Sequence, residues 1–182
     1  KNLDLVVEAV VESLEVKKKI FNELDAKVSA DTVLATNTSS LSITEISKAV
    51  RDPKRVVGMH FFNPVDKMPL VEVIRGKETS DEAVATVFQF AKKVGKTPIV
   101  VKDAPGFVVN RILGPYLNEA VYLLLEGVSP SRMDKVMEKF GMPMGPIALL
   151  DEVGLDVAAK VSHVLYQAFG ERMKPPSAID LV

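Results

Sequence analysis

Two residues of the chain could act together as an acid–base pair: the histidine of GMHFFNP (residues 58–64) and a glutamate twelve positions later. His60 ends an apolar run that predicts a strand, and Glu72 lies in the next predicted strand. If that strand returns beside the first, the two side chains can face each other. A carboxylate bonded to one imidazole nitrogen fixes the tautomer and makes the other nitrogen more basic. Such a pair could take a proton from an alcohol or return one to a ketone.

His60 also has a structural interpretation. A histidine at a strand end is more often a hydrogen-bonded structural residue than a catalytic one, and a strand glutamate by itself is more often solvated. The pair is a stronger signal than either residue. The pattern of residues leaves both interpretations open.

Further polar residues are predicted at the same edge of a sheet. The letters NTSS (residues 37–40) follow a predicted strand, and ligands of open α/β sheets bind beyond the carboxyl ends of the strands. Ser39 could donate to a substrate oxygen, whereas Ser42 is expected to cap the next helix. Asn110 lies in the first turn of a predicted long helix, where it could bond a ligand or a neighbouring loop.

Hydrophobic patterns divide the chain near residue 103. Before that point short apolar runs alternate with amphipathic segments, and after DAPG (103–106) only helical patterns remain. We therefore expect a doubly wound α/β domain over residues 1–102, followed by an all-α domain over residues 103–182. The predicted strands are 3–10, 32–35, 55–60, 70–75 and 97–102, and the predicted helices of the second part include 107–126, 130–140 and 155–169.

Capping residues and apolar stripes predict how the helices begin and pack. The first helix, residues 14–29, has apolar residues at every fourth position, which we expect to be its buried stripe, with the lysines after Val16 solvated. The stripe is Val16, Ile20, Leu24 and Val28. The residues expected to cap helices are Ser13, Ser42 with Glu45, Thr79 with Glu82, and Ser129.

Composition excludes several classes of protein. The chain is 47% hydrophobic and 26% charged with a net charge of −1, so no nucleic-acid or anionic-membrane surface is indicated. It has no cysteine, which excludes disulfides and thiolate metal sites, and its two histidines are far apart, so no metal site is predicted. No GxGxxG or Walker pattern is present. Because the chain begins without methionine just before a strand and ends on the apolar AIDLV, we expect it to be part of a longer protein.

Six stretches, taken in order, resemble the L-3-hydroxyacyl-CoA dehydrogenase family: DLVVEAVVE, ATNTSSLSI, GMHFFNPV, LVEVI, KDAPGFVVNRIL and MPMGPIALLDEVGLD. The resemblance covers nearly the whole chain, and its specificity lies in the combination. FGERMKPP makes the chain most similar to the dehydrogenase part of multifunctional fatty-acid oxidation enzymes. The resemblance implies NAD as cofactor and the oxidation of an L-3-hydroxyacyl-CoA to a 3-ketoacyl-CoA.

The family's residue roles carry over position by position. His60 matches the catalytic base and Glu72 its carboxylate partner. Ser39 and Asn110 match residues that contact the substrate near its reacting oxygen. The positions that match cofactor contacts are Val10 and Val11 through their backbone, and the side chains of Glu12, Lys17, Ser39 and Asn63.

The chain also departs from the family pattern. The family's dinucleotide fingerprint has no match here, so we expect a partial Rossmann-type sheet that lacks the first βαβ unit. The lysines that meet the coenzyme A phosphates have no match either. Open sheet edges and apolar surface favour association, most simply a homodimer. The resemblance further implies a thiolase subunit as a partner, and a location in the bacterial cytoplasm, or in mitochondria or peroxisomes of a eukaryote.

Two rival interpretations remain beside the resemblance. Other two-domain reductases, such as 3-hydroxyisobutyrate and 6-phosphogluconate dehydrogenases, share the predicted architecture but use a central catalytic lysine that has no match here. A structural protein without activity is also possible, since lambda-crystallin resembles this family. The residues His60, Glu72, Ser39 and Asn110 together favour the dehydrogenase.

The absence of a glycine-rich phosphate loop predicts weak binding of NAD by these 182 residues, because the pyrophosphate would meet no helix N-terminus built for it. We expect no saturation in a calorimetric titration at micromolar NAD. Saturation in the micromolar range would contradict this prediction.

Overall fold

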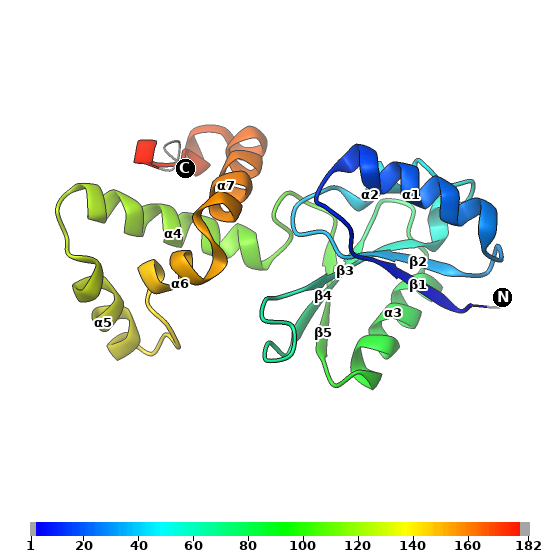
Figure 1. The fold of residues 1–182 in the computed structure, drawn as a ribbon, viewed down its shortest axis with the longest axis horizontal. Coiled ribbons are helices and arrows are strands. Elements are labelled where there is room, and N and C mark those ends of the chain that lie inside the picture. The colour runs from blue at the N-terminus through cyan, green and yellow to red at the C-terminus, as the bar shows by residue number, and fades with distance from the viewer. Residues whose placement is uncertain (1–2, 179–182) are drawn as a thin grey trace. The chain divides into compact units, whose positions relative to one another are not determined.

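Five strands form one sheet in the order β1-β2-β3-β4-β5 (Figure 1). β1, β2 and β3 are parallel, β4 is antiparallel to β3, and β5 is parallel to β4. The strands are Leu5–Glu8 (β1), Val33–Thr36 (β2), Val56–Phe61 (β3), Leu70–Arg75 (β4) and Thr97–Lys102 (β5). All five were predicted, although β1 is shorter than the expected strand.

Helices cover both faces of this sheet, as Figure 1 shows. Helices α1 (Leu14–Lys27) and α2 (Ile43–Ser47) lie on one face, and α3 (Asp81–Lys93) lies on the other. Successive strand residues point to opposite faces, so Val57 and Met59 pack against α3 while Val56 belongs to the core under α1 and α2. The predicted doubly wound α/β fold is confirmed.

The described residues after β5 form helices and their connections. Four α-helices follow, α4 (Val109–Leu125), α5 (Pro130–Phe140), α6 (Pro146–Val153) and α7 (Leu155–Phe169), and then the 3₁₀ turn Gly170–Met173. α5 begins and ends as predicted, because Ser129 accepts a hydrogen bond from the Arg132 amide and Gly141 ends the helix at φ 120°. The expected all-α part is therefore confirmed.

The structure is a computed structural model that describes residues 3–178. Most of the apolar AIDLV end lies outside the described residues. Within them the chain divides into two compact units, with the boundary between Phe107 and Val108. No helix of the described part is both long and apolar enough to cross a membrane.

The buried face of α1 differs from the predicted stripe. Val16 is exposed, whereas Lys17, Phe21 and Asp25 are buried. Leu24 and Val28 of the stripe do pack against the core. The prediction was wrong for Val16, because two charged residues of the helix have buried partners of opposite charge: Lys17 binds a strand glutamate, and Asp25 binds an arginine next to β3. Ser13 does occupy the N-cap position, but its side chain makes no capping hydrogen bond.

The N-cap of α3 also differs from the prediction. Ser80 caps the helix, accepting a hydrogen bond from the Ala83 amide at 3.1 Å. Thr79 was the expected cap, but its hydroxyl donates to the Val56 carbonyl at 2.6 Å and accepts from the Gly76 amide at 2.9 Å. The threonine therefore satisfies backbone groups at the ends of β3 and β4 instead.

A buried aspartate ties α1 to the segment that precedes β3. The Asp25 carboxylate binds the buried Arg55 guanidinium and accepts from Arg51 Nε at 2.7 Å. Burial alone would raise the pKa of the Asp25 carboxyl, but the hydrogen bonds and charge of the two arginines outweigh it and hold the pKa below its ordinary value. The ion pair therefore stabilises the fold above the ordinary aspartate pKa of about 3.9 and stops doing so as the pH falls through the lower folded value.

We expect Asp25→Asn to lower the free energy of unfolding by about 3 kcal/mol at neutral pH, because it leaves the buried Arg55 without its counter-charge. Urea unfolding measures this loss, and the difference from the wild type should shrink below about pH 4. The exposed Asp31→Asn is the matched control, with an expected change within about 0.5 kcal/mol. Equal losses in the two variants would contradict the assignment.

Candidate active site

His60 and Glu72 face each other across the antiparallel pair of β3 and β4. The strand register places the two residues directly opposite, and His60 Nδ1 lies 2.8 Å from Glu72 Oε2. Both side chains are buried, and Glu72 has no exposed surface. When Nδ1 carries the proton donated to Glu72, the neutral ring presents Nε2 as an acceptor. The structure thus brings together the two residues that the sequence suggested as a pair.

The loop after β2 is organised around Glu12. Its Oε1 accepts hydrogen bonds from Thr38 Oγ1 at 2.6 Å, from the Ser39 amide at 2.9 Å and from the Ser40 amide at 3.1 Å. Ser39 Oγ also lies 3.1 Å from this oxygen. Two residues of the predicted site, Glu12 and Ser39, are therefore in direct contact.

These donors determine the charge state of Glu12. Burial alone would raise the pKa of its carboxyl, but hydrogen bonds from Thr38 and Ser39 and the charge of Lys17 outweigh burial and lower the pKa. Glu12 therefore stays ionised to a lower pH than an ordinary glutamate. Its side chain remains one-third exposed, at 33%, so the carboxylate can still accept a hydrogen bond from a ligand.

A buried ion pair lies beneath the loop that follows β1. Lys17 Nζ has no exposed surface and lies 2.8 Å from Glu8 Oε1. The same ammonium donates to the carbonyls of Val10 at 3.3 Å and Asn37 at 3.5 Å, and lies 3.8 Å from Glu12 Oε2. Lys17 thus links the loops that follow β1 and β2.

Glu8 belongs to this cluster, although the sequence did not point to it. Its Oε2 accepts from Thr36 Oγ1 at 2.7 Å and its Oε1 from the Val10 amide at 2.5 Å. The available signal was an acidic residue inside an apolar strand, nine positions before a lysine of the next helix. We expected the lysine run to be a solvated face, and for Lys17 this was wrong, because Glu8 supplies a buried counter-charge.

The remaining predicted residues lie on loops and on the second unit. Val10 and Val11 are exposed on the loop after β1, and Asn63 is exposed on the loop between β3 and β4. Asn37, the first residue of the NTSS stretch, accepts a hydrogen bond from the Phe61 amide at 3.2 Å and so joins the ends of β2 and β3. Asn110 is half-buried in the first turn of α4, where it was predicted.

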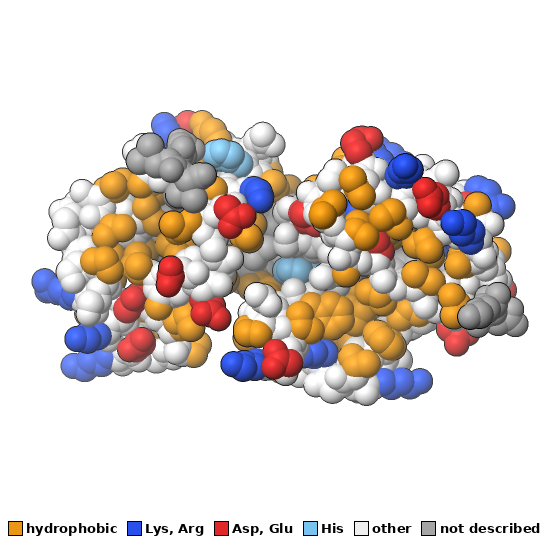
Figure 2. All heavy atoms as spheres, in the orientation of Figure 1, with side chains coloured by type: hydrophobic (Ala, Val, Ile, Leu, Met, Phe, Trp, Pro, Cys, Tyr) orange, Lys and Arg blue, Asp and Glu red, His pale blue; other side chains and the backbone are white. Residues whose placement is uncertain are grey.

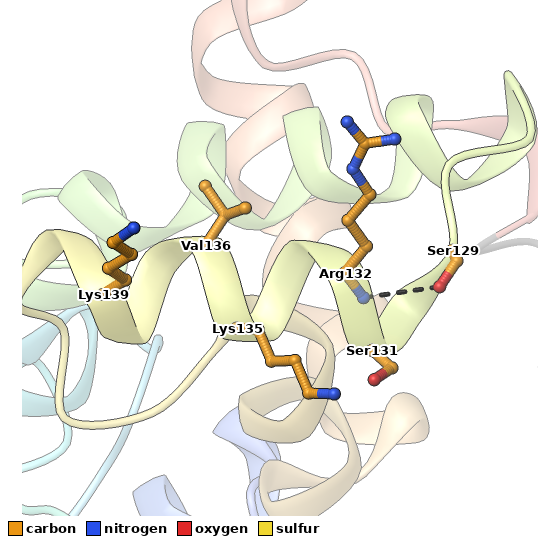
Figure 3. Close-up of a pocket in the computed structure, with 6 residues that line it drawn as sticks. All are labelled: Ser129, Ser131, Arg132, Lys135, Val136 and Lys139. Atoms are coloured by element: carbon orange, nitrogen blue, oxygen red, sulfur yellow. Dashed lines mark hydrogen bonds between the residues drawn. The ribbon is translucent and has the colours of Figure 1, made fainter.

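A surface hollow outside the predicted residues does not form a second candidate site. A shallow hollow of about 360 Å³ runs along α5, but Figure 3 shows its side chains pointing to different sides of the helix. None of the predicted site residues lines it; the lining residues are Ser129, Ser131, Arg132, Lys135, Val136 and Lys139. The described residues contain no group of His, Asp or Glu side chains placed to hold a metal ion.

Comparison with known proteins identifies the family. The family model "3-hydroxyacyl-CoA dehydrogenase, NAD binding domain" matches residues 1–104, and the model of the C-terminal domain of the same family matches residues 106–181. The chain belongs to the 3-hydroxyacyl-CoA dehydrogenase family. The family is one of NAD-dependent oxidoreductases, and its NAD-binding-domain model covers the whole sheet of this chain.

Individual members of the 3-hydroxyacyl-CoA dehydrogenase family are similar over nearly all of this chain. The fatty acid oxidation complex subunit alpha of Shewanella amazonensis is 53% identical over 180 residues, which are 99% of this chain and 26% of that protein. The solved (S)-3-hydroxybutyryl-CoA dehydrogenase from Ralstonia eutropha is 45% identical with a TM-score of 0.93, covering 98% of this chain and 64% of that one. The 3-hydroxybutyryl-CoA dehydrogenase from Escherichia coli is 41% identical with a TM-score of 0.92, covering 98% and 39%. The chain thus spans about a quarter of the length of the Shewanella amazonensis protein.

The polar groups at the carboxyl edge of the sheet are chemically suited to bond parts of NAD. The partly exposed Glu12 carboxylate, the exposed backbone of residues 10–11 and the Asn63 amide can bond ribose hydroxyls and a carboxamide. The sequence offers no glycine-rich turn for the pyrophosphate. These residues therefore offer hydrogen-bond partners of the kinds that NAD presents, ribose hydroxyls and a carboxamide.

We expect Lys17→Met to lower the free energy of unfolding by about 3–5 kcal/mol, because it leaves the Glu8 carboxylate buried without a counter-charge. Chemical denaturation measures the loss. Lys19→Met, an exposed lysine of the same helix, is the matched control and should change stability by less than about 0.5 kcal/mol. A Lys17→Met protein as stable as the control would show that the ion pair does not hold these loops.

Proposed function

We propose that this chain carries the reacting centre of an L-3-hydroxyacyl-CoA dehydrogenase. The observation that carries the proposal is the buried contact of 2.8 Å between His60 Nδ1 and Glu72 Oε2. It leaves Nε2 as the nitrogen that exchanges a proton with the substrate. The names of the relatives, a subunit of a fatty acid oxidation complex and two 3-hydroxybutyryl-CoA dehydrogenases, support the substrate class.

In the proposed reaction, His60 acts as the general base. Nε2 takes the proton of the C3 hydroxyl, the C–H bond at C3 breaks, and the C3–O bond becomes a carbonyl. NAD, when bound, supplies the chemistry of a hydride acceptor. In the reverse direction the imidazolium returns its proton to the ketone oxygen.

Glu72 is proposed to stabilise the imidazolium form of the buried His60. Proton transfer turns the imidazole into a cation, and an unpaired cation without water around it is costly. The Glu72 carboxylate lies against the nitrogen that does not react, so the cation forms beside a fixed negative charge. We assign Glu72 the roles of orienting the ring and stabilising the imidazolium.

Ser39 and Asn110 are proposed to hydrogen-bond the reacting oxygen. Ser39 is placed on the loop at the carboxyl edge of β2, and its hydroxyl lies against Glu12 Oε1 at 3.1 Å. It can donate to a substrate oxygen only by giving up a donated bond to this carboxylate, because a hydroxyl has one proton. If Ser39 donates to the substrate instead of to Glu12, binding of the substrate is coupled to the Glu12 carboxylate, which is proposed to contact the cofactor.

The cofactor side of the proposal rests on the loops that follow β1 and β3. Glu12 would accept from a ribose hydroxyl, while the backbone of Val10 and Val11 and the side chain of Asn63 would line the nicotinamide riboside. Lys17 has its ammonium buried among Glu8 and two carbonyls. We therefore assign it to holding Val10 and Glu12 in place for the cofactor.

We also propose that the chain associates. Figure 2 shows apolar side chains among the charged ones on the visible surface, and helical residues such as Ile112, Val136 and Phe140 are more than half exposed. A homodimer would cover such surface, and a thiolase subunit is proposed as the second partner of a larger complex. Light scattering across a concentration series tests the dimer, and a monomer at every concentration would refute it.

We expect His60→Gln to lower turnover by about 10²- to 10⁴-fold, because glutamine can fill the space but cannot take the proton. NADH absorbance with L-3-hydroxybutyryl-CoA measures turnover, in this chain and in a form extended upstream to include a glycine-rich turn. The other histidine provides the control, since His163→Gln removes an exposed imidazole from α7 and should leave turnover unchanged. Full activity of His60→Gln in the extended form would overturn the proposal.

A further inference from the structure

The imidazole of His60 is flanked by two phenylalanine rings. The ring centroid of Phe62 lies 4.4 Å from that of His60, with 53° between the planes. The Phe107 centroid lies 5.9 Å away, with 58° between the planes. Both rings are tilted against the imidazole and lie close enough to pack beside it.

Phe107 holds this place in an unusual backbone conformation. Its φ is +47°, and it is the described residue other than glycine with a positive φ. The left-handed region crowds the Cβ atom, so an aromatic residue there is strained and only glycine adopts it freely. Strain of this kind persists where the surrounding structure fixes the residue, and it concentrates at functional sites. Phe107 is only 3% exposed, so its ring is firmly enclosed.

The turn that contains Phe107 is fixed at its start by Asp103. This carboxylate accepts from Ser42 Oγ at 2.8 Å and from the Thr44 amide at 2.8 Å, which ties the turn to the N-terminus of α2. The Asp103 amide donates to the Arg75 carbonyl at the end of β4, and the Phe107 amide donates to the Ala104 carbonyl at 2.8 Å. The turn is therefore anchored to the same strand that carries Glu72.

We propose that Phe107 is a positioning residue for His60. Together with Phe62 it keeps Nδ1 directed at Glu72, and its ring favours the imidazolium over the neutral imidazole. The negative face of an aromatic ring stabilises a nearby cation, and the effect is larger where water is excluded. The relevance of this ring to the reaction rests on the proposed role of His60 as the base, because during turnover an imidazolium forms there only if His60 takes the proton of the substrate.

A plain core role is the alternative, since Phe107 also belongs to the apolar core under α1 and α2. Phe21 belongs to the same core and is completely buried. A core role predicts that the two phenylalanines respond alike to substitution, with a loss of stability and no specific effect on His60. The positioning role predicts that substitution of Phe107 changes the titration of His60, whereas substitution of Phe21 does not.

The test is an NMR titration of the two histidines in the whole chain, with neither NAD nor substrate present. Resonances are assigned with His163→Gln, and His163 serves as the internal reference. Leucine keeps the site apolar but removes the ring, so we expect Phe107→Leu to lower the pKa of His60 by about half a unit. Phe107→Tyr keeps the ring and should leave the pKa within about 0.2 units, and Phe21→Leu should leave it unchanged. Glu72, the charged group that the structure pairs with His60, is kept in every variant.

An unchanged or raised pKa in Phe107→Leu, or an equal fall in Phe21→Leu, would overturn the proposal. If Phe107→Leu does not fold, Phe107→Met carries the same test, because methionine adapts to an apolar space and also lacks the ring. If the NMR titration contradicts the role of Phe107, the proposal that His60 is the base is unaffected. If the turnover assay contradicts that proposal, the measured titration of His60 in the variants is unchanged.

Discussion

A carboxylate without exposed surface must have a partner, and this constraint shapes the candidate site. Burying an unpaired ionised carboxylate is far more costly than a typical domain can tolerate. Glu72 is completely buried, and the antiparallel register of β3 and β4 places His60 opposite it. A register shift of one residue would turn one of the two side chains to the other face of the sheet. The geometry of the pair therefore depends on the pairing of the two strands.

The same constraint operates at the first strand. Glu8 is buried at the end of β1 and is balanced by Lys17, whose ammonium also holds the carbonyls of the two neighbouring loops. Glu12 in turn accepts hydrogen bonds from hydroxyl and amide groups of residues 38–40. Apolar cores on both faces hold the sheet together, whereas paired charges shape its carboxyl edge. The residues proposed for function at this edge are therefore also ones whose contacts hold it in place.

Membership in the 3-hydroxyacyl-CoA dehydrogenase family and the local geometry support each other without repeating the same information. The family models cover the chain from residue 1 to 181 but do not say what each side chain does. The contacts of these side chains suggest a separate physical role for each. His60 is the proposed base and has its ring oriented by Glu72, Glu12 is an ionised acceptor, and Lys17 is a buried cation that joins two loops. Phe107, whose backbone has a positive φ, places its ring beside the proposed base.

The sequence by itself determined the fold class and the five strands, because these follow from short-range periodicity. Capping residues gave the bounds of α5 but not the N-cap of α3. It also suggested the pair of His60 and Glu72, since a strand, a loop and a returning strand have few geometries. It failed for the buried face of α1, where the apolar stripe suggested Val16 and the structure buries Lys17 instead. It also missed Glu8 and the ring of Phe107 beside His60. Only the tertiary structure decided these, because a buried charge or a strained backbone is stable only next to partners that are distant in sequence.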